Sequence, residues 1–526
     1  MFRTVVQNRQ AKTPEDRTQN GEHDGPGKHQ GDRRDVVIVG GGLAGMATAL
    51  RLQAAGLSTM VLEAHGHAGG CAGYWRHRGF SFDVGATTLV DFEPGGVGAE
   101  LLDTVGLPPV RGEQLPGYVA WLPDRRVVLH RDPAAWHAER LRAFGDDEAH
   151  RALWTLLDRL ADVFWRAARE GIRMPVRRPG DLLHNVRALR ASNLPLTRYL
   201  FATMGDALHK HGLDREPALP ALLGMLIEDT VHSGVEKAPL VNAALGITIR
   251  GAGLTRPHGG MHGFWRTLVT HYRELGGDLR TGTGVSRVDG EPGAFTVHTR
   301  RNRFEAGQVV LAVPAEVSAR ICPRVMPRLL PYLERDRSEL GGAVLVMLGV
   351  PESEVNDEGF THHQLLHDYD QPLGDGNNMF VSVSTAGDEL SAPAGHRAVM
   401  VSTHTSLPSW ADLDDEEYAQ HKKELGERLV GLARRVYPRL GDRAVVVDVG
   451  TPRTYQRFGF RPDGAVGGPH QTLRNSNQFA IPHDLGGRGL WLVGDSTWPG
   501  LGTVACVLGS RIVADGVRRE RRRKDR

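Results

Sequence analysis

Cysteine is scarce in this chain, with three residues among 526: Cys71, Cys322 and Cys506. Three thiols cannot form the disulfide framework of a small secreted domain, and their spacing fits no zinc site. The sequence therefore indicates a reducing compartment.

Long hydrophobic runs are also missing. The best candidate for a membrane span, Val36 to Leu50, is rich in glycine and shorter than the roughly 20 residues of a spanning helix. Residues 1–33 show no signal-peptide pattern. They are polar, mixed in charge and without periodicity, so we expect a disordered extension there.

The chain lacks an excess of either charge. Lys and Arg total 64 while Asp and Glu total 62, which gives a net charge of +2 and argues against nucleic acid as the main partner. The exception is the C-terminal segment 518–526, RRERRRKDR, with seven basic and two acidic residues. Two interpretations stay open for it: a solvated tail, or a contact with an anionic membrane surface.

Patterns of metal ligands are missing too. The candidate histidines are His65, His67, His362, His363 and His367. No cysteine or carboxylate pattern completes a site around them, so we predict no metal.

Glycine, by contrast, is abundant, with 65 residues among 526, and no collagen period is visible. The excess indicates tight turns and places where backbone approaches a ligand. Hydrophobic residues make up 40% of the chain and charged residues 24%, which is typical of a folded protein with a substantial core.

The first ordered unit predicts a nucleotide site. A buried strand is expected over residues 35–39, a helix over 46–54 and a second strand over 57–62. Between the first strand and the helix stands Gly40-x-Gly42-x-x-Gly45, where the first glycine permits a tight turn, the second close approach to a pyrophosphate, and the third close helix packing. Glu63 follows the second strand, where a carboxylate accepts hydrogen bonds from ribose hydroxyls. No second unit of this kind is visible, so the sequence predicts one dinucleotide.

The motifs that follow resemble flavoproteins of the amine-oxidase and carotenoid-desaturase superfamily. They are the glycine pair Gly69-Gly70 and the run from Phe80 to Gly85. The C-terminal pair Gly494-Asp495 is similar to the superfamily's second flavin motif, in which the Asp binds the ribityl chain. The next helix, expected from Thr503 to Val517, would then direct its positive end at the flavin ring. Cys71 stands where many members have a basic residue, which disfavours ordinary amine oxidases.

Within that superfamily the chain is most similar to bacterial carotenoid 3′,4′-desaturases. The similar stretches include Gly69–Ala72, Phe82–Thr87, Glu93–Gly96 and Gly494–Gly500. Carotenoid cis–trans isomerases and retinol saturases share much of the pattern. The resemblance implies FAD as cofactor, held by Gly40, Gly42, Leu43, Ala44, Gly45, Glu63, Ala64, Gly69, Gly70, Cys71, Val285, Gly494, Asp495, Gly502, Thr503 and Val504. No catalytic acid or base can be named from the sequence.

The implied architecture is an α/β fold, a Rossmann-type FAD-binding domain with an inserted α+β substrate lobe. We expect the FAD-binding domain to comprise residues 34–110, 259–325 and 481–517. The substrate lobe would comprise 111–258, where helical spacing prevails, and 326–480. Residues 518–526 would form the basic tail.

The implied function is FAD-dependent oxidation of a carotenoid or related polyene, most simply desaturation by hydride transfer to flavin N5. The alternatives are a redox-neutral isomerase that uses reduced FAD, a reductase like retinol saturase, and a non-enzymatic prenyl-lipid binding protein of the same fold. Oxygen or a quinone would accept the electrons. The segment Leu182–Arg190, apolar on one helical face and basic on the other, fits either a cap helix or a membrane-surface helix. We therefore expect a cytoplasmic protein at the inner face of a membrane.

Overall fold

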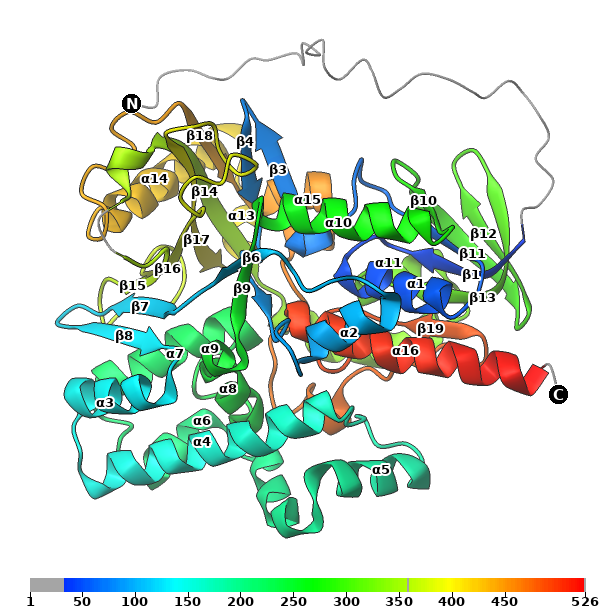
Figure 1. Cartoon of the computed structure of the whole chain (residues 1–526), viewed down its shortest axis with the longest axis horizontal. Helices are drawn as coiled ribbons and strands as arrows, with labels where there is room; N and C mark the ends of the chain where they lie inside the picture. Colours follow the sequence, from blue (N-terminus) through cyan, green and yellow to red (C-terminus); the bar gives the residue numbers. More distant parts are fainter. Residues whose placement is uncertain (1–32, 357–358, 525–526) are drawn as a thin grey trace.

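The computed structural model describes residues 33–356 and 359–524, and its two largest sheets have seven strands each. The first sheet lies at the right of Figure 1, the second at the upper left, and a layer of helices lies below them. The first sheet has the order β10-β2-β1-β13-β12-β11, with β19 paired to β13. Its strands are β1 (Arg34–Val39), β2 (Thr59–Leu62), β10 (Asp278–Arg280), β11 (Val285–Glu291), β12 (Ala294–Thr299), β13 (Arg303–Leu311) and β19 (Leu490–Leu492).

Alternation along β1 explains why both faces of the first sheet are covered. Val36 and Ile38 face one core cluster, which includes α1 (Leu43–Ala54) and α16 (Thr503–Lys524). Val37 and Val39 face the opposite cluster, with α11 (Ala315–Ile321) and α12 (Met326–Asp336). β1 pairs in parallel with β2 and β13, as a strand buried on both faces does. The helix predicted from residue 46 begins three residues earlier, directly after Gly42.

The second sheet has the order β18-β14-β17-β16-β15-β7-β8. Helix α14 (Asp415–Ala433) covers one face, and Phe80 and Phe82 pack on the other. The sequence predicted helices throughout the region of β7 and β8, which form a hairpin instead. The strands are β7 (Gly117–Trp121), β8 (Arg126–His130), β14 (Gly342–Pro351), β15 (His362–Leu366), β16 (Asn378–Val383), β17 (His396–Thr405) and β18 (Val446–Gly450).

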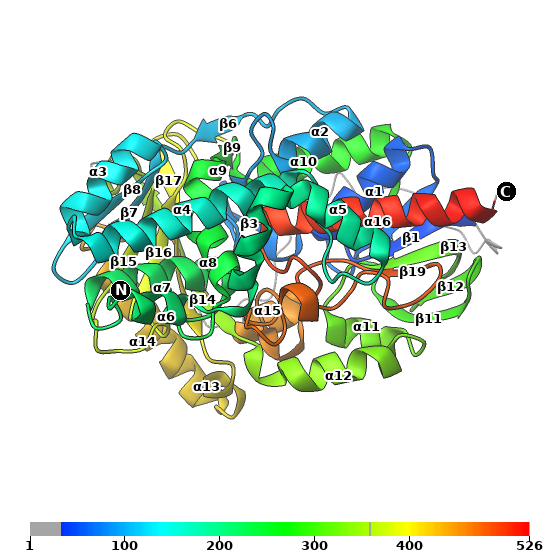
Figure 2. The ribbon, with the colours of Figure 1, turned by 90° about the horizontal axis from the view of Figure 1, so that it is seen from below.

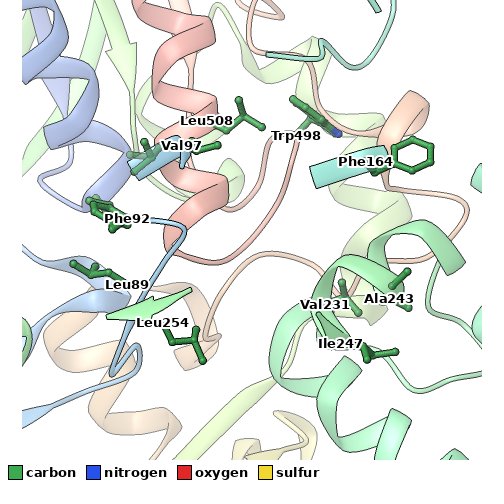
Figure 3. Packing of buried hydrophobic residues seen from close by; sticks show 14 of the residues in the cluster. Leu89, Phe92, Val97, Phe164, Val231, Ala243, Ile247, Leu254, Trp498 and Leu508 are labelled. Carbon is green, nitrogen blue, oxygen red and sulfur yellow. The ribbon is translucent and has the colours of Figure 1, made fainter. Parts of the chain in front are cut away.

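The helical layer continues the hydrophobic core of the first sheet. Figure 2, from below, shows α4 and α5 across the front of this layer. Figure 3 shows Leu89, Phe92, Val97 and Leu508 from the first-sheet side in the same cluster as Val231, Ala243 and Ile247 from the helical layer. The helices are α3 (Pro133–Phe144), α4 (Glu148–Arg169), α5 (Pro179–Leu189), η3 (Ala191–Phe201), α6 (Met204–Lys210), α7 (Ala218–Val231), α8 (Leu240–Ile247) and α9 (Ile249–Ala252).

Smaller elements connect these layers. The predicted helix after Gly259 is α10 (Gly260–Glu274). A small sheet of β5, β9 and β6 joins the layers near the centre of the molecule. The remaining elements are α2 (Val97–Val105), β3 (Tyr74–His77), β4 (Phe80–Asp83), β5 (Leu89–Val90), β6 (Gly112–Gln114), β9 (Leu254–Pro257), α13 (Pro408–Ala411), α15 (Pro452–Gly459), η2 (Gly70–Ala72), η4 (Arg337–Glu339), η5 (Glu352–Glu354), η6 (Pro462–Gly464) and η7 (Asn477–Phe479).

The C-terminal helix differs from the expectation. It was predicted to end at Val517, but α16 runs to Lys524, so most of the segment expected to be a separate basic tail is helical. Glu520 Oε2 accepts a hydrogen bond from the Gly489 amide at 2.8 Å, and Arg521 forms an ion pair with Asp35 at 2.6 Å. These contacts hold the basic segment against the first sheet.

None of the helices in the described ranges combines the length and apolar character that crossing a membrane requires.

Candidate functional site

The glycine loop after β1 has the geometry of a phosphate cradle. Gly40 has φ +104°, and a Cβ there would lie 2.4 Å from the Ala312 carbonyl oxygen. A Cβ at Gly45 would lie 2.1 Å from the Gly40 oxygen, so this glycine allows α1 to pack closely on the loop. A Cβ built on Gly42 would meet only the Cα of Gly70, at 3.9 Å, so the side of Gly42 that faces the cavity is open to a ligand. The positive end of α1 begins at the same point.

A second glycine pair lies beside this loop. Gly42 and Gly69 form a parallel bridge, and the Gly69 amide donates to the Gly41 carbonyl at 3.0 Å. Gly70 begins the short helix η2 with φ +57°. The two glycine motifs, separate in the sequence, therefore present adjacent backbone to one space.

Glu63 is fixed at the end of β2. Its Oε2 accepts from the Gly41 amide at 2.6 Å and its Oε1 from the His65 amide at 2.7 Å. Burial raises the pKa of Glu63, although these amide donors oppose the shift. The carboxylate lies at the edge of the cavity described next, where a ribose hydroxyl can reach it.

The predicted cofactor residues meet around one cavity. All of them line it except Gly45, which lies in the first turn of α1 and packs against Gly40 and Ala312. The cavity has a volume of about 1880 Å³ and extends from the glycine loop to α5. A site for one small molecule typically has roughly 300–1,000 Å³, so this space has room for a dinucleotide and a second large molecule.

The C-terminal motif closes the cavity on the side of α16. Gly494 and Gly502 have φ values of +129° and +103°, and no atom lies within 4 Å of a Cβ built on either. Thr503 begins α16, and its Oγ1 accepts from the Val90 amide at 3.2 Å. The N-terminal end of a long helix thus faces the cavity and favours negative charge there.

Arg461 is a site residue that the sequence reasoning missed. Its Nη2 lies 2.9 Å from Asp495 Oδ2, and its Nη1 donates to Cys71 Sγ at 3.4 Å. Burial disfavours its charge, but Asp495 and Cys71 hold the pKa of Arg461 above its ordinary value. Its Nε is buried without a hydrogen-bond partner among the described residues. Arg461 therefore brings a positive charge beside Cys71, at whose position many members of the superfamily have a basic residue. A guanidinium there suits the phosphates of FAD.

The cavity lining includes a second polar group that no sequence signal indicated. Asp229, His232 and His404 line the cavity, and they come from the end of α7 and from β17. Their segments are far apart in the chain, and none belongs to a recognisable motif. Most of the other lining between them and α5 is apolar, including Phe164, Leu226 and Leu245.

The far end of the cavity opens at α5 and η3. The helix expected over 182–190 is α5, and Leu182, Val186 and Leu189 line the cavity. Large apolar side chains are exposed beside this opening: Leu182 is 56% exposed, Leu183 53% and Phe201 68%.

Of the histidines considered as metal ligands, His65 and His67 lie together, with ring centroids 4.2 Å apart. His362 and His363 are buried in β15, where His362 stacks on Tyr118 and His363 contacts Tyr437. Within residues 33–356 and 359–524, no three His, Cys, Asp or Glu side chains are grouped to hold a metal.

Comparison with known proteins agrees with this geometry. Prolycopene isomerase 1, chloroplastic, from an Oncidium hybrid cultivar is 24% identical, with 93% of this chain and 84% of that protein covered. The 4,4′-diapophytoene desaturase of Staphylococcus aureus strain COL is 21% identical, with 91% and 98% covered. Among solved structures, cyclohexylamine oxidase from Brevibacterium oxydans IH-35A aligns with a TM-score of 0.56 at 16% identity, covering 93% of this chain and 99% of that one.

The protein-family model described as "Flavin containing amine oxidoreductase" matches residues 43–517, which make up most of the chain. Together with the similar folds, this match confirms the predicted Rossmann-type α/β fold, the FAD cofactor and the oxidoreductase class. The chain belongs to the family of flavin-containing amine oxidoreductases.

Proposed function

We propose that this protein is an FAD-dependent desaturase of a long acyclic carotenoid or a related polyene. The observation that carries the proposal is the single cavity that joins the dinucleotide loop to an apolar opening at α5. The cavity has room for a second large molecule beside a dinucleotide, which favours a long apolar substrate over a small amine. The family assignment argues against the non-enzymatic lipid-binding alternative.

The cofactor would be held by the glycine loop, Glu63 and Asp495, with Arg461 at the phosphates. When bound, FAD supplies the hydride acceptor. The chain itself excludes water from the cavity and aligns the polyene along its apolar wall. Burial of hydrocarbon stabilises the complex by roughly 0.8 kcal/mol per CH₂, so no charged anchor is needed. We propose oxygen or a quinone as the final electron acceptor.

The relatives support a polyene substrate, since their names specify prolycopene, diapophytoene and diaponeurosporene. They also favour a second candidate, the redox-neutral cis–trans isomerisation of a polyene with reduced FAD. Four prolycopene isomerases are 23–24% identical to this chain, against 21% for the desaturase.

We propose further that the protein associates peripherally with a membrane through α5 and η3. Leu182, Leu183 and Phe201 would enter the apolar part of the bilayer beside the cavity opening. Arg187, Arg190 and Arg198 in the same segment would lie near anionic headgroups. A substrate dissolved in the bilayer would then enter without crossing water.

Pigment analysis of cells that make acyclic carotenoids, with and without this protein, tests the proposal. A product lighter by two hydrogens, with absorption at longer wavelength, supports desaturation. A product of unchanged mass and altered retention supports isomerisation, and a product heavier by two hydrogens indicates a saturase. Purified protein without flavin absorbance, or a flavoprotein that converts no polyene, contradicts the proposal.

A further inference from the structure

We propose that His232 and His404, supported by the carboxylates of Asp229 and Glu228, exchange the proton with the polyene. The inference rests on the proposed function and names the acid–base group of that same site. It follows from the position of the two histidines, from their contacts and from the charges around them.

The two imidazoles form a close pair in the cavity wall. Their ring centroids are 4.8 Å apart, and the rings meet nearly edge to face at 75°. His404 Nε2 lies 3.7 Å from Asp229 Oδ1. Both histidines and Asp229 line the cavity, so a substrate can reach them without a change of fold.

Packing places His232 at the cofactor end of the cavity. A Cβ on Gly467 would lie 2.6 Å from His232 Cε1, so this glycine packs directly on the ring. The Gly467 carbonyl accepts from Arg461, which pairs with Asp495. The ring is therefore three short contacts from the side chain predicted to bind the ribityl chain.

A second chain of contacts leads to the same place. The Val231 carbonyl, next to His232, accepts from the Gln471 amide at 3.0 Å. The Gln471 side chain donates to the Pro499 carbonyl at 3.1 Å, just before α16 begins. Two separate series of contacts therefore connect His232 to the residues around the predicted flavin site.

The surroundings shift the pKa values of the two histidines in opposite directions. Burial lowers the pKa of His232 well below its ordinary value, and His404, His470 and Arg461 add to this effect. Burial also opposes charge on His404, but the carboxylates of Glu228 and Asp229 raise its pKa above the ordinary value. A neutral imidazole therefore stands beside one that favours its proton, as in sites that divide acid and base roles.

The carboxylates are themselves anchored. Glu228 Oε2 accepts from Asn378 Nδ2 at 2.5 Å, and Asp229 accepts from the Gln364 amide. Burial raises the pKa of Glu228, and the charges of Asp229 and of Asp375, an exposed residue, add to the shift. Glu228 and Asp229 are thus fixed beside His404, where they favour its protonated form.

In the desaturation, a hydride leaves one carbon for the flavin, so the polyene is oxidised and the flavin reduced. The C–H bond of the neighbouring carbon breaks, and its electron pair forms the new double bond. The proton goes to the neutral imidazole of His232, beside which His404 lies between it and the carboxylates. In the isomerisation, His404 would give a proton to the polyene and His232 would remove one, with no net redox change.

The test uses the FAD-loaded enzyme, an acyclic polyene hydrocarbon and single-turnover kinetics without oxygen. His232→Asn removes the base while keeping a residue type that tolerates the left-handed backbone at this position, φ +57°. We expect at least a hundredfold slower flavin reduction, the usual scale for a lost acid–base group, with unchanged FAD content and polyene affinity. The part of the pH–rate profile that reports the titration of His232 and His404 should disappear. His404→Gln leaves this base in place and should displace the profile instead, because the charge of His404 acts on the pKa of His232.

The matched control is His137→Gln, because His137 is exposed on α3 and does not line the cavity. It should stay within threefold of the unmodified enzyme. If His232→Asn does not fold, Asp229→Asn replaces it, with an expected tenfold loss and a displaced pH profile. Rates within threefold and an unchanged profile in all these variants would overturn the proton-transfer assignment alone. An unmodified FAD-loaded enzyme that converts no polyene would overturn the proposed function, and this assignment with it.

Discussion

The guanidinium of Arg461 and the carboxylate of Asp495 form an ion pair of 2.9 Å in the lining of the cofactor cavity. Arg461 directly precedes η6, whereas Asp495 follows β19 of the first sheet. The pair therefore forms only when the segment 326–480 has packed correctly against the first sheet.

Replacement of Arg461 by Gln should weaken FAD binding about 10- to 100-fold, because a charge-assisted hydrogen bond contributes roughly 1.5–3 kcal/mol. Titration of the apoprotein with FAD, followed by flavin fluorescence, measures this. Arg474→Gln is the control, since Arg474 is exposed and outside the cavity. Equal affinities of the two variants would remove Arg461 from the cofactor site.

Substitutions at two glycines of the same loop should affect cofactor binding and folding differently. Gly42→Val should abolish FAD retention and leave the melting temperature of the apoprotein nearly unchanged, since a side chain there meets only the Gly70 Cα at 3.9 Å. Gly45→Val should lower the melting temperature itself, because its Cβ would lie 2.1 Å from the Gly40 oxygen. Thermal unfolding and flavin absorbance of both variants, beside Gly66→Ala at an open position, check this. Full FAD occupancy in Gly42→Val would show that the loop is misassigned.

Stability should fall as the pH is lowered from about 6.5 toward 4. Burial lowers the pKa of His363 to about 4, so in this range the unfolded chain binds a proton that the folded chain does not. The free energy of unfolding should then decrease by at most about 1.4 kcal/mol per pH unit for this group. Denaturant unfolding between pH 7.5 and 4.5 tests this. His363→Gln should make the decrease shallower, and a slope identical to that of the unmodified protein would contradict the account.

The apolar opening should mediate membrane binding. Replacing Leu182, Leu183 and Phe201 together by Ser should reduce co-sedimentation with lipid vesicles at least tenfold, because three exposed apolar side chains are lost. Val445→Ser with Val447→Ser is the control, since these residues are also exposed but lie at β18. Loss of binding in the control, or none in the triple variant, would place the contact elsewhere.

The sequence predicted the parts of the site that are local. Gly40, Gly42 and Glu63 belong to one strand–loop–helix–strand unit, so spacing alone indicates their roles. Arg461, His232 and His404 stand in segments without a motif, and only tertiary packing brings them to the cavity.

Tertiary contacts also explain the errors in the elements. The charges after Val517 suggested a free tail, but Glu520 and Arg521 find partners on the first sheet that continue the helix. The hairpin β7–β8 was missed because its strands are short and precede a long stretch of helical spacing, while β7 gains a parallel partner in β15.

The three-part origin of the first sheet has a consequence for biosynthesis. β1 is made early, but β19 and α16, which complete the cavity with Asp495 and Thr503, are made only after both inserted segments. A nascent chain therefore has no finished nucleotide pocket until α16 has been made. A chain terminated before β19 would thus lack part of the cofactor site.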